Sequence, residues 1–205
     1  MSWSDDEQVA WYLERIGKLE ARRAGEQMLV AVLPPAPRRM LDLGCGDGRL
    51  VELVLGTRPS VTEAVAIDRS PPMLVAARER FADRPVVDVR ERDLAEPITE
   101  LGSFDLVVSG FAIHHLEHDR KQQLFGEVAA QLRSGGMFAN LEVVASASDR
   151  WHQEFLTEIG RTADDPEDRL ASVDDQLSWM RDAGLVDVDC IWRWRGFALL
   201  VGLSG

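Results

Sequence analysis

The sequence predicts an α/β protein built on a doubly wound, mostly parallel β-sheet, and three features of the chain indicate this fold class. From residue 38 onward, short apolar runs alternate with helical segments, as in successive βαβ units. The first run leads into a glycine-rich turn, "LGCGDG" at 43–48. The chain ends in two apolar runs flanking Arg195-Gly196, which predicts an antiparallel hairpin added to the parallel sheet.

The N-terminal segment, residues 1–33, is predicted to be one long helix from about Glu7 to Leu33, because apolar residues recur there at helical spacing. "PPAP" at 34–37 ends it, since proline has no amide hydrogen to donate. This helix either closes over a binding site as a lid, with Arg22 and Arg23 facing an anionic group, or packs as an ordinary amphipathic helix.

The central segment, residues 38–144, carries the alternating pattern. A helix opened by Ser70 follows the second strand, and another helix spans about 118–133. Strands that are separated by helices and buried on both faces imply a parallel sheet with right-handed crossovers. The five predicted strands are "RMLDLG", "EAVAID", "PVVDVRERD", "FDLVVSG" and "GGMFANLEV".

The last third changes character. Residues 145–172 are polar and weakly periodic, which predicts a helical insertion over the edge of the sheet. Residues 173–205 then form a helix that stops at Gly184 and the two strands of the hairpin. In the first of these strands, alternation predicts Val188, Cys190 and Trp192 on one face.

Composition limits the class of protein. With 205 residues and 45% hydrophobic content, the chain can bury one proper core, so we expect a single domain over 1–205. No apolar stretch reaches the roughly 18 residues that a membrane span needs, and the N-terminus has no signal-like pattern. We therefore expect a cytoplasmic protein without membrane association, and the excess of Arg over Lys indicates a bacterial source.

Charge and cysteine content narrow the possible partners. A net charge of −12 opposes polyanions, so nucleic acid is disfavoured and a small-molecule partner is favoured. Cys45 and Cys190 have no metal-ligand spacing and are too few for a disulfide framework. We expect free thiols and no metal site.

The glycine turn indicates a ligand site, since ligands of doubly wound sheets bind beyond the carboxyl ends of the strands. Gly44, Gly46 and Gly48 allow unusual backbone angles and remove side chains that would hold a ligand away. A dinucleotide fingerprint would place its third glycine at position 49, where this chain has Arg49. A tight structural turn is the alternative.

Two carboxylates follow at the ends of the next strands. Asp68 is placed to accept the hydroxyls of a ribose, with a helix-capping role as the alternative. Asp93 with the apolar Leu94 suits an adenine amino group and ring face, with a solvated loop aspartate as the alternative.

Five stretches, "LDLGCGDG", "AIDRSPPML", "RDL", "FDLVVSGFAIHHL" and "LRSGGMFANLEV", resemble in order and spacing the class I S-adenosylmethionine-dependent methyltransferases over residues 38–144. The resemblance implies a Rossmann-like, seven-stranded sheet whose last strand is antiparallel. It also implies S-adenosyl-L-methionine as cofactor, with its methionine part over Gly44 to Gly46, and Ser109 to Phe111 near the sulfonium. The cofactor-binding residues that it implies are Asp42, Gly44, Cys45, Gly46, Asp68, Arg69, Met73, Asp93, Leu94 and Ser109.

The resemblance also bears on catalysis. His115 matches the histidine that commonly follows the fourth strand of this family, and His114 is its neighbour. Either one is a candidate general base because a histidine titrates near neutrality, whereas local packing is the alternative role.

Three functions remain open from sequence. The first is methyl transfer to a small-molecule acceptor. The alternatives are an RNA-modifying or cofactor-modifying enzyme and a non-catalytic S-adenosylmethionine-binding protein. The acceptor-facing segments, 1–33 and 145–172, are the least patterned of the chain, so neither the acceptor nor its reacting atom is predicted.

Overall fold

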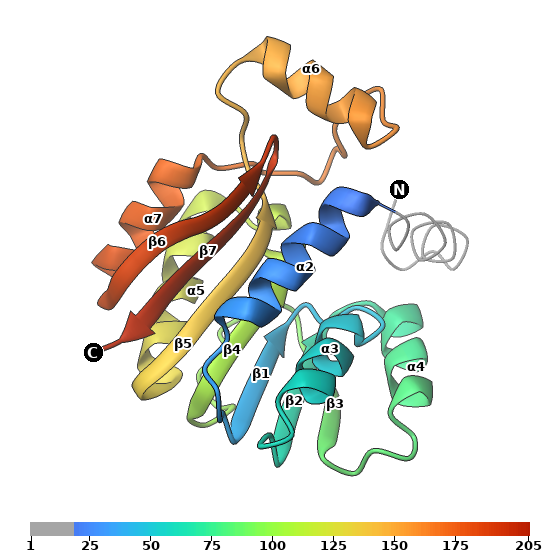
Figure 1. The fold of residues 1–205 in the computed structure, drawn as a ribbon, viewed down its shortest axis with the longest axis vertical. Coiled ribbons are helices and arrows are strands. Elements are labelled where there is room, and N and C mark those ends of the chain that lie inside the picture. The colour runs from blue at the N-terminus through green and yellow to red at the C-terminus, as the bar shows by residue number, and fades with distance from the viewer. Residues whose placement is uncertain (1–18) are drawn as a thin grey trace.

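The computed structural model describes residues 19–205, and its centre is one seven-stranded sheet with helices on both faces (Figure 1). The strands are β1 (Arg39–Leu43), β2 (Glu63–Asp68), β3 (Val87–Glu91), β4 (Phe104–Gly110), β5 (Leu132–Val143), β6 (Leu185–Trp194) and β7 (Phe197–Ser204). Their order is β3-β2-β1-β4-β5-β7-β6. Strands β1 to β5 pair in parallel, and β7 is antiparallel to both β5 and β6. The predicted mixed sheet with an antiparallel last strand is confirmed.

The helices form two layers around this sheet (Figure 1). They are α2 (Glu20–Val32), α3 (Arg49–Thr57), α4 (Pro71–Arg80), the short 3₁₀ turn η1 (Ile113–His115), α5 (His118–Gln131), α6 (Asp149–Glu158) and α7 (Val173–Asp182). Leu29 of α2 and Val51 of α3 belong to the apolar cluster on one face, and Phe125 of α5 and Met180 of α7 to that on the other. Both faces are therefore buried, as a parallel sheet requires.

The helix boundaries follow their local signals with one exception. Helix α2 ends at Val32, just before the proline segment, and the earlier part of the helix predicted from Glu7 lies outside the described residues. Gly184 follows α7 with φ +93°, as expected for a left-handed helix stop. Ser70 precedes α4, but its side chain makes no capping bond. Instead its backbone N–H donates to Asp68 Oδ1 at 2.8 Å, so the carboxylate before the helix anchors the turn.

The predicted alternation along β6 is wrong beyond Cys190. The pairing of β6 with β7 shifts between Cys190 and Trp192, which adds a bulge. Val188 and Cys190 therefore pack on the α7 side of the sheet, whereas Trp192 packs on the α2 side. A bulge reverses the face that later residues occupy, and simple alternation has no means of locating it.

The β6–β7 hairpin also contacts the insertion, residues 145–172, through helix α6. Helix α6 lies beyond the carboxyl ends of the strands, above the tip of the β6–β7 hairpin (Figure 1). Arg195 at this tip pairs with Glu154 of α6 at 3.0 Å and with Glu158 at 3.5 Å. The charge of Arg195 is therefore paired with acidic residues of the insertion.

Candidate functional site

A cavity of about 1040 Å³, counted together with its solvent-open mouth, lies at the carboxyl ends of β1, β2 and β4. Its walls come from helix α2, the end of β1 with the turn that follows it, the start of α3, the end of β2 with the start of α4, the loop after β3, and the segment from the end of β4 through η1, together with Leu141 of β5. The site that the sequence predicts beyond the carboxyl ends of the strands is therefore a real concavity of the fold.

The glycine turn between β1 and α3 forms one wall. Gly44 and Gly46 have φ +70° and +54°, in the left-handed region that favours glycine. A Cβ atom on Gly44 would lie 2.2 Å from the Cβ of Ala112, whereas one on Gly46 would meet only the sulfur of Met73 at 3.8 Å. Gly44 is thus required by close packing, and Gly46 leaves the cavity open at its backbone.

Asp42 lines the cavity from β1 and is fully buried. Neither of its carboxylate oxygens has a hydrogen-bond partner within residues 19–205. Burial, together with the nearby charges of Asp68 and Asp47, raises the pKa of Asp42 to about 8. Because a buried carboxylate without a donor is costly, Asp42 is poised to accept a hydrogen bond from a cationic ligand.

Asp68 closes the opposite side of the turn. Its Oδ2 accepts from Gly46 N at 2.8 Å, while its Oδ1 accepts from Ser70 N at 2.8 Å. Burial raises the pKa of Asp68, and the backbone N–H groups of Ser70, Gly46 and Arg69 oppose this shift. Asp68 therefore joins the first two strand ends, and its remaining lone pairs line the cavity.

The far end of this wall contains Asp93, Leu94 and Met73, which all line the cavity. Leu94 and Met73 are buried and supply apolar surface there. Arg69 is half-exposed and pairs with Glu167 of the insertion at 3.0 Å, with Asp93 3.9 Å away. An ionic contact thus joins the insertion to the loop after β2.

Two arginines meet at the wall formed by α2 and α3. The sequence predicted Arg22 to face an anionic group but did not predict Arg49 there. Arg49 donates to both oxygens of Glu26 at 2.7 Å, and Arg22 donates to the same carboxylate at 2.9 Å. All three line the cavity, and the Arg22 guanidinium also lies 4.9 Å from the centre of the Phe111 ring. Arg49 stands where a dinucleotide fingerprint has glycine. This replacement is the sequence feature that could have indicated a side chain at this wall of the cavity.

The segment after β4 forms the remaining wall through Phe111 and Ala112. Phe111 has φ +57°, a strained conformation for a residue with a side chain, and such outliers concentrate at functional sites. Ser109, predicted to contact the cofactor, does not line this cavity. It is buried in β4, and its hydroxyl donates to Leu43 O at 2.8 Å.

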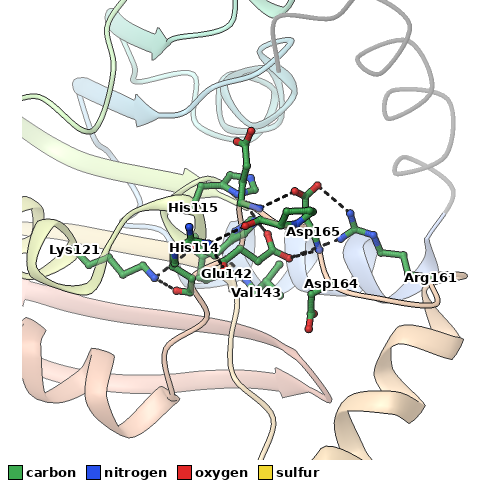
Figure 2. A network of polar contacts seen from close by, with 12 residues as sticks. His114, His115, Lys121, Glu142, Val143, Arg161, Asp164 and Asp165 are labelled. Carbon is green, nitrogen blue, oxygen red and sulfur yellow. Dashed lines mark hydrogen bonds and ion pairs between the residues drawn. The ribbon is translucent and has the colours of Figure 1, made fainter. Parts of the chain in front are cut away.

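The two histidines occupy different places. His115 lines the cavity, while His114 is buried behind it, with Nδ1 2.6 Å from Glu142 Oε1 (Figure 2). Burial, together with the charges of His114 and Arg69, lowers the pKa of His115 to about 2. Of the two predicted catalytic histidines, only His115 can meet a ligand in this cavity.

The structure therefore brings most of the predicted cofactor residues together. Cys45 belongs to this group as a buried thiol whose pKa burial raises. Predicted residues that line the cavity are Asp42, Gly44, Cys45, Gly46, Asp68, Arg69, Met73, Asp93, Leu94 and His115.

Comparisons with known proteins agree with this geometry. A family model described as "Methyltransferase domain" matches residues 40–136. The chain is 30% identical over 194 residues to a trans-aconitate 2-methyltransferase of Methylobacterium nodulans, covering 91% of this chain and 71% of that relative. It is 31% identical over 129 residues to an uncharacterized methyltransferase of Mycobacterium tuberculosis, and this match spans only 62% of that relative's length.

Solved structures show the same fold. Human N-acetylserotonin methyltransferase in complex with SAM superimposes with a TM-score of 0.74 at 14% identity, covering 99% of this chain and 57% of that one. The order of the strands, the glycine turn and the carboxylates at the strand ends define a methyltransferase of the Rossmann-like type. The chain belongs to the class I S-adenosylmethionine-dependent methyltransferases, whose cofactor is S-adenosylmethionine. In the part described, 19–205, no helix is long and apolar enough to cross a membrane.

Proposed function

We propose that this protein transfers a methyl group from S-adenosylmethionine to a small-molecule acceptor in the cytoplasm. The observation that carries the proposal is Asp42, a buried carboxyl group that lines the cavity beside the glycine turn and accepts no hydrogen bond from the described residues, 19–205. The α-ammonium group of the cofactor is a donor of the required charge. The residues present therefore fit the cofactor of the family.

We assign the binding roles by the chemistry of each wall. Asp42 would hold the α-ammonium group, Asp68 would accept the ribose hydroxyls, and Asp93 with Leu94 would meet the adenine. Arg22 is a buried cation at the cavity and would face the cofactor's carboxylate. When bound, the cofactor supplies a methyl group on a positively charged sulfur, already activated for transfer.

The acceptor would enter beside Phe111, Leu116 and His115, which all line the cavity. Phe111 and Leu116 are apolar and would exclude water there. A small molecule is favoured over nucleic acid because the chain carries a net charge of −12. The name of the Methylobacterium relative also refers to a small organic acid. That His115 acts as a general base stays a prediction.

Asp68→Ala tests the ribose assignment. We expect this change to weaken S-adenosylhomocysteine binding by roughly 1.5 to 3 kcal/mol, the range for hydrogen bonds to a charged group. Because Asp68 also anchors Gly46 N and Ser70 N, thermal unfolding of the same variant must be measured beside calorimetric binding. Asp88→Asn, on the exposed side of β3, is the matched control. Unchanged affinity in a folded Asp68→Ala protein would rule out the ribose contact.

The cofactor class has its own test. S-adenosylmethionine and S-adenosylhomocysteine should both bind, and a nicotinamide dinucleotide should bind far more weakly because Arg49 replaces the third glycine of its fingerprint. Calorimetry with the three ligands measures the order. Tighter binding of the dinucleotide, or no binding of S-adenosylhomocysteine, would contradict the proposal.

A further inference from the structure

Three potential ligand atoms converge where η1 meets the loop that follows α6. They are His114 Nε2, His115 Nδ1 and Asp168 Oδ1, which all lie within 4.8 Å of one another. Asp168 Oδ1 is 3.5 Å from His114 Nε2 and 3.4 Å from His115 Nδ1. The turn η1 makes this possible by holding the two consecutive imidazole rings 4.0 Å apart (Figure 2).

These distances suit an ion better than direct hydrogen bonds. An N–H···O hydrogen bond usually spans about 2.7–3.2 Å. In contrast, ligand atoms bound tetrahedrally at about 2.0–2.1 Å from a zinc ion lie about 3.3–3.4 Å from one another. Both histidine–aspartate distances match this separation, and the two histidine nitrogens lie within 4.8 Å of each other.

Asp168 supplies an independent observation. Its side chain is only 7% exposed, and Oδ1 has no hydrogen-bond partner in the described chain. Its Oδ2 accepts from Asp165 N at 3.3 Å and lies 4.0 Å from Arg161, so the carboxylate is held with Oδ1 toward the histidines. Asp168 Oδ1 is thus a buried oxygen that faces two imidazole nitrogens and accepts no hydrogen bond from the described residues. This arrangement indicates a cation between the three atoms.

Glu142 orients His114 so that its Nε2 can bind an ion. Glu142 Oε1 accepts from His114 Nδ1 at 2.6 Å, which leaves the lone pair of Nε2 on the side of Asp168. A carboxylate behind a histidine is the usual arrangement around protein metal sites. The loop is fixed to η1 because Arg169 N donates to His114 O at 2.8 Å and Lys121 donates to Arg169 O.

We propose that His114, His115 and Asp168 bind a zinc ion or a similar divalent transition metal, with Glu142 orienting His114. Three protein ligands leave a fourth coordination position open, as in catalytic zinc sites. Because His115 lines the cavity, the ion would lie at its wall, where an oxygen or nitrogen atom of the acceptor can occupy the open position. Only this last step rests on the proposed function.

The test measures ion binding directly. The full chain is stripped with a chelator and titrated with Zn²⁺ against a coloured competing chelator, and with Co²⁺ while its visible absorption is recorded. We expect one ion per chain and the strong absorption of tetrahedral cobalt. Asp168→Asn should weaken Zn²⁺ binding by at least about 100-fold, and Glu142→Gln, behind His114, by roughly 10- to 100-fold.

A second histidine–aspartate pair in the same chain provides the control. His152 Nε2 lies 2.9 Å from Asp164 on the insertion, and His152→Ala should leave the Zn²⁺ affinity unchanged. Thermal unfolding shows whether each variant is folded. No Zn²⁺ binding by the unaltered chain, or equal losses in Asp168→Asn and His152→Ala, would overturn the proposal. Binding of S-adenosylhomocysteine to the metal-free chain separately tests the proposed function.

Discussion

Asp42→Asn is expected to weaken binding of S-adenosylhomocysteine by roughly 2 to 5 kcal/mol, the range for removing one charge of a buried, hydrogen-bonded pair. The asparagine keeps the size of the side chain but removes the charge that the α-ammonium group needs. The fold should survive, since neither oxygen of Asp42 is hydrogen-bonded to any residue between 19 and 205. Isothermal titration calorimetry measures the loss, and Asp88→Asn is the control.

The same carboxyl group makes both stability and binding depend on pH. Burial raises the pKa of Asp42 from 3.8 to about 8, so the folded state binds a proton more tightly than the unfolded state. The free energy of unfolding of the ligand-free protein should therefore fall as pH rises between these two values. Cofactor binding should strengthen over the same range, because the ammonium group favours the ionised carboxylate.

Calorimetry at neutral pH in buffers of different ionisation enthalpy should detect a proton released on binding, and Asp42→Asn should abolish it. The unfolding midpoint of this variant should also lose the component of its pH dependence that comes from Asp42. If the variant is folded and binds with unchanged affinity and no change in proton release, another group holds the ammonium end of the cofactor.

The sheet was predictable because its signals are local. Each parallel strand is a short apolar run, and β1 ends directly in the glycines that its turn requires. The same local signals predicted Asp42, Asp68 and Asp93 at the ends of strands. The carboxyl ends of neighbouring parallel strands bring such side chains to one edge of the sheet. The lid expected over residues 1–33 is described only from residue 19, where α2 contributes Arg22 and Glu26 to the cavity.

The remaining features depend on contacts between distant segments. The contact of Arg49 with Glu26 joins α3 to α2, and that of Asp168 with the histidines joins a polar insertion to η1. Apolar periodicity predicts a helix or strand but does not say which polar side chains of distant segments meet, so neither contact is predictable from the local pattern. The contact of Ser109 is another example: the family motif identifies the segment at the end of β4, but only the folded structure shows that the Ser109 hydroxyl donates to Leu43 O.

Gly44→Ala and Gly46→Ala should separate the two requirements that the glycine turn meets. Both residues have positive φ, so each alanine costs roughly 1–2 kcal/mol of backbone strain. Gly44→Ala should lose roughly a further 1–3 kcal/mol of stability, because its Cβ would overlap that of Ala112 at 2.2 Å. Gly46→Ala should lose cofactor affinity instead, since its methyl group would project into the open cavity beside Met73. Thermal unfolding and calorimetric binding distinguish these outcomes.

A double-mutant cycle makes the first half of this prediction specific. Ala112→Gly removes the atom that the new methyl group would strike, so the Gly44→Ala, Ala112→Gly protein should recover at least about 1 kcal/mol relative to the sum of the single changes. Gly56→Ala is the control, because nothing lies within 4 Å of a Cβ atom there and the residue is inside α3. It should be neutral or stabilising, as alanine favours a helix over glycine. Additive effects at 44 and 112 would mean that the loss comes from backbone strain alone, and that the close approach of the turn to Ala112 does not shape the cavity.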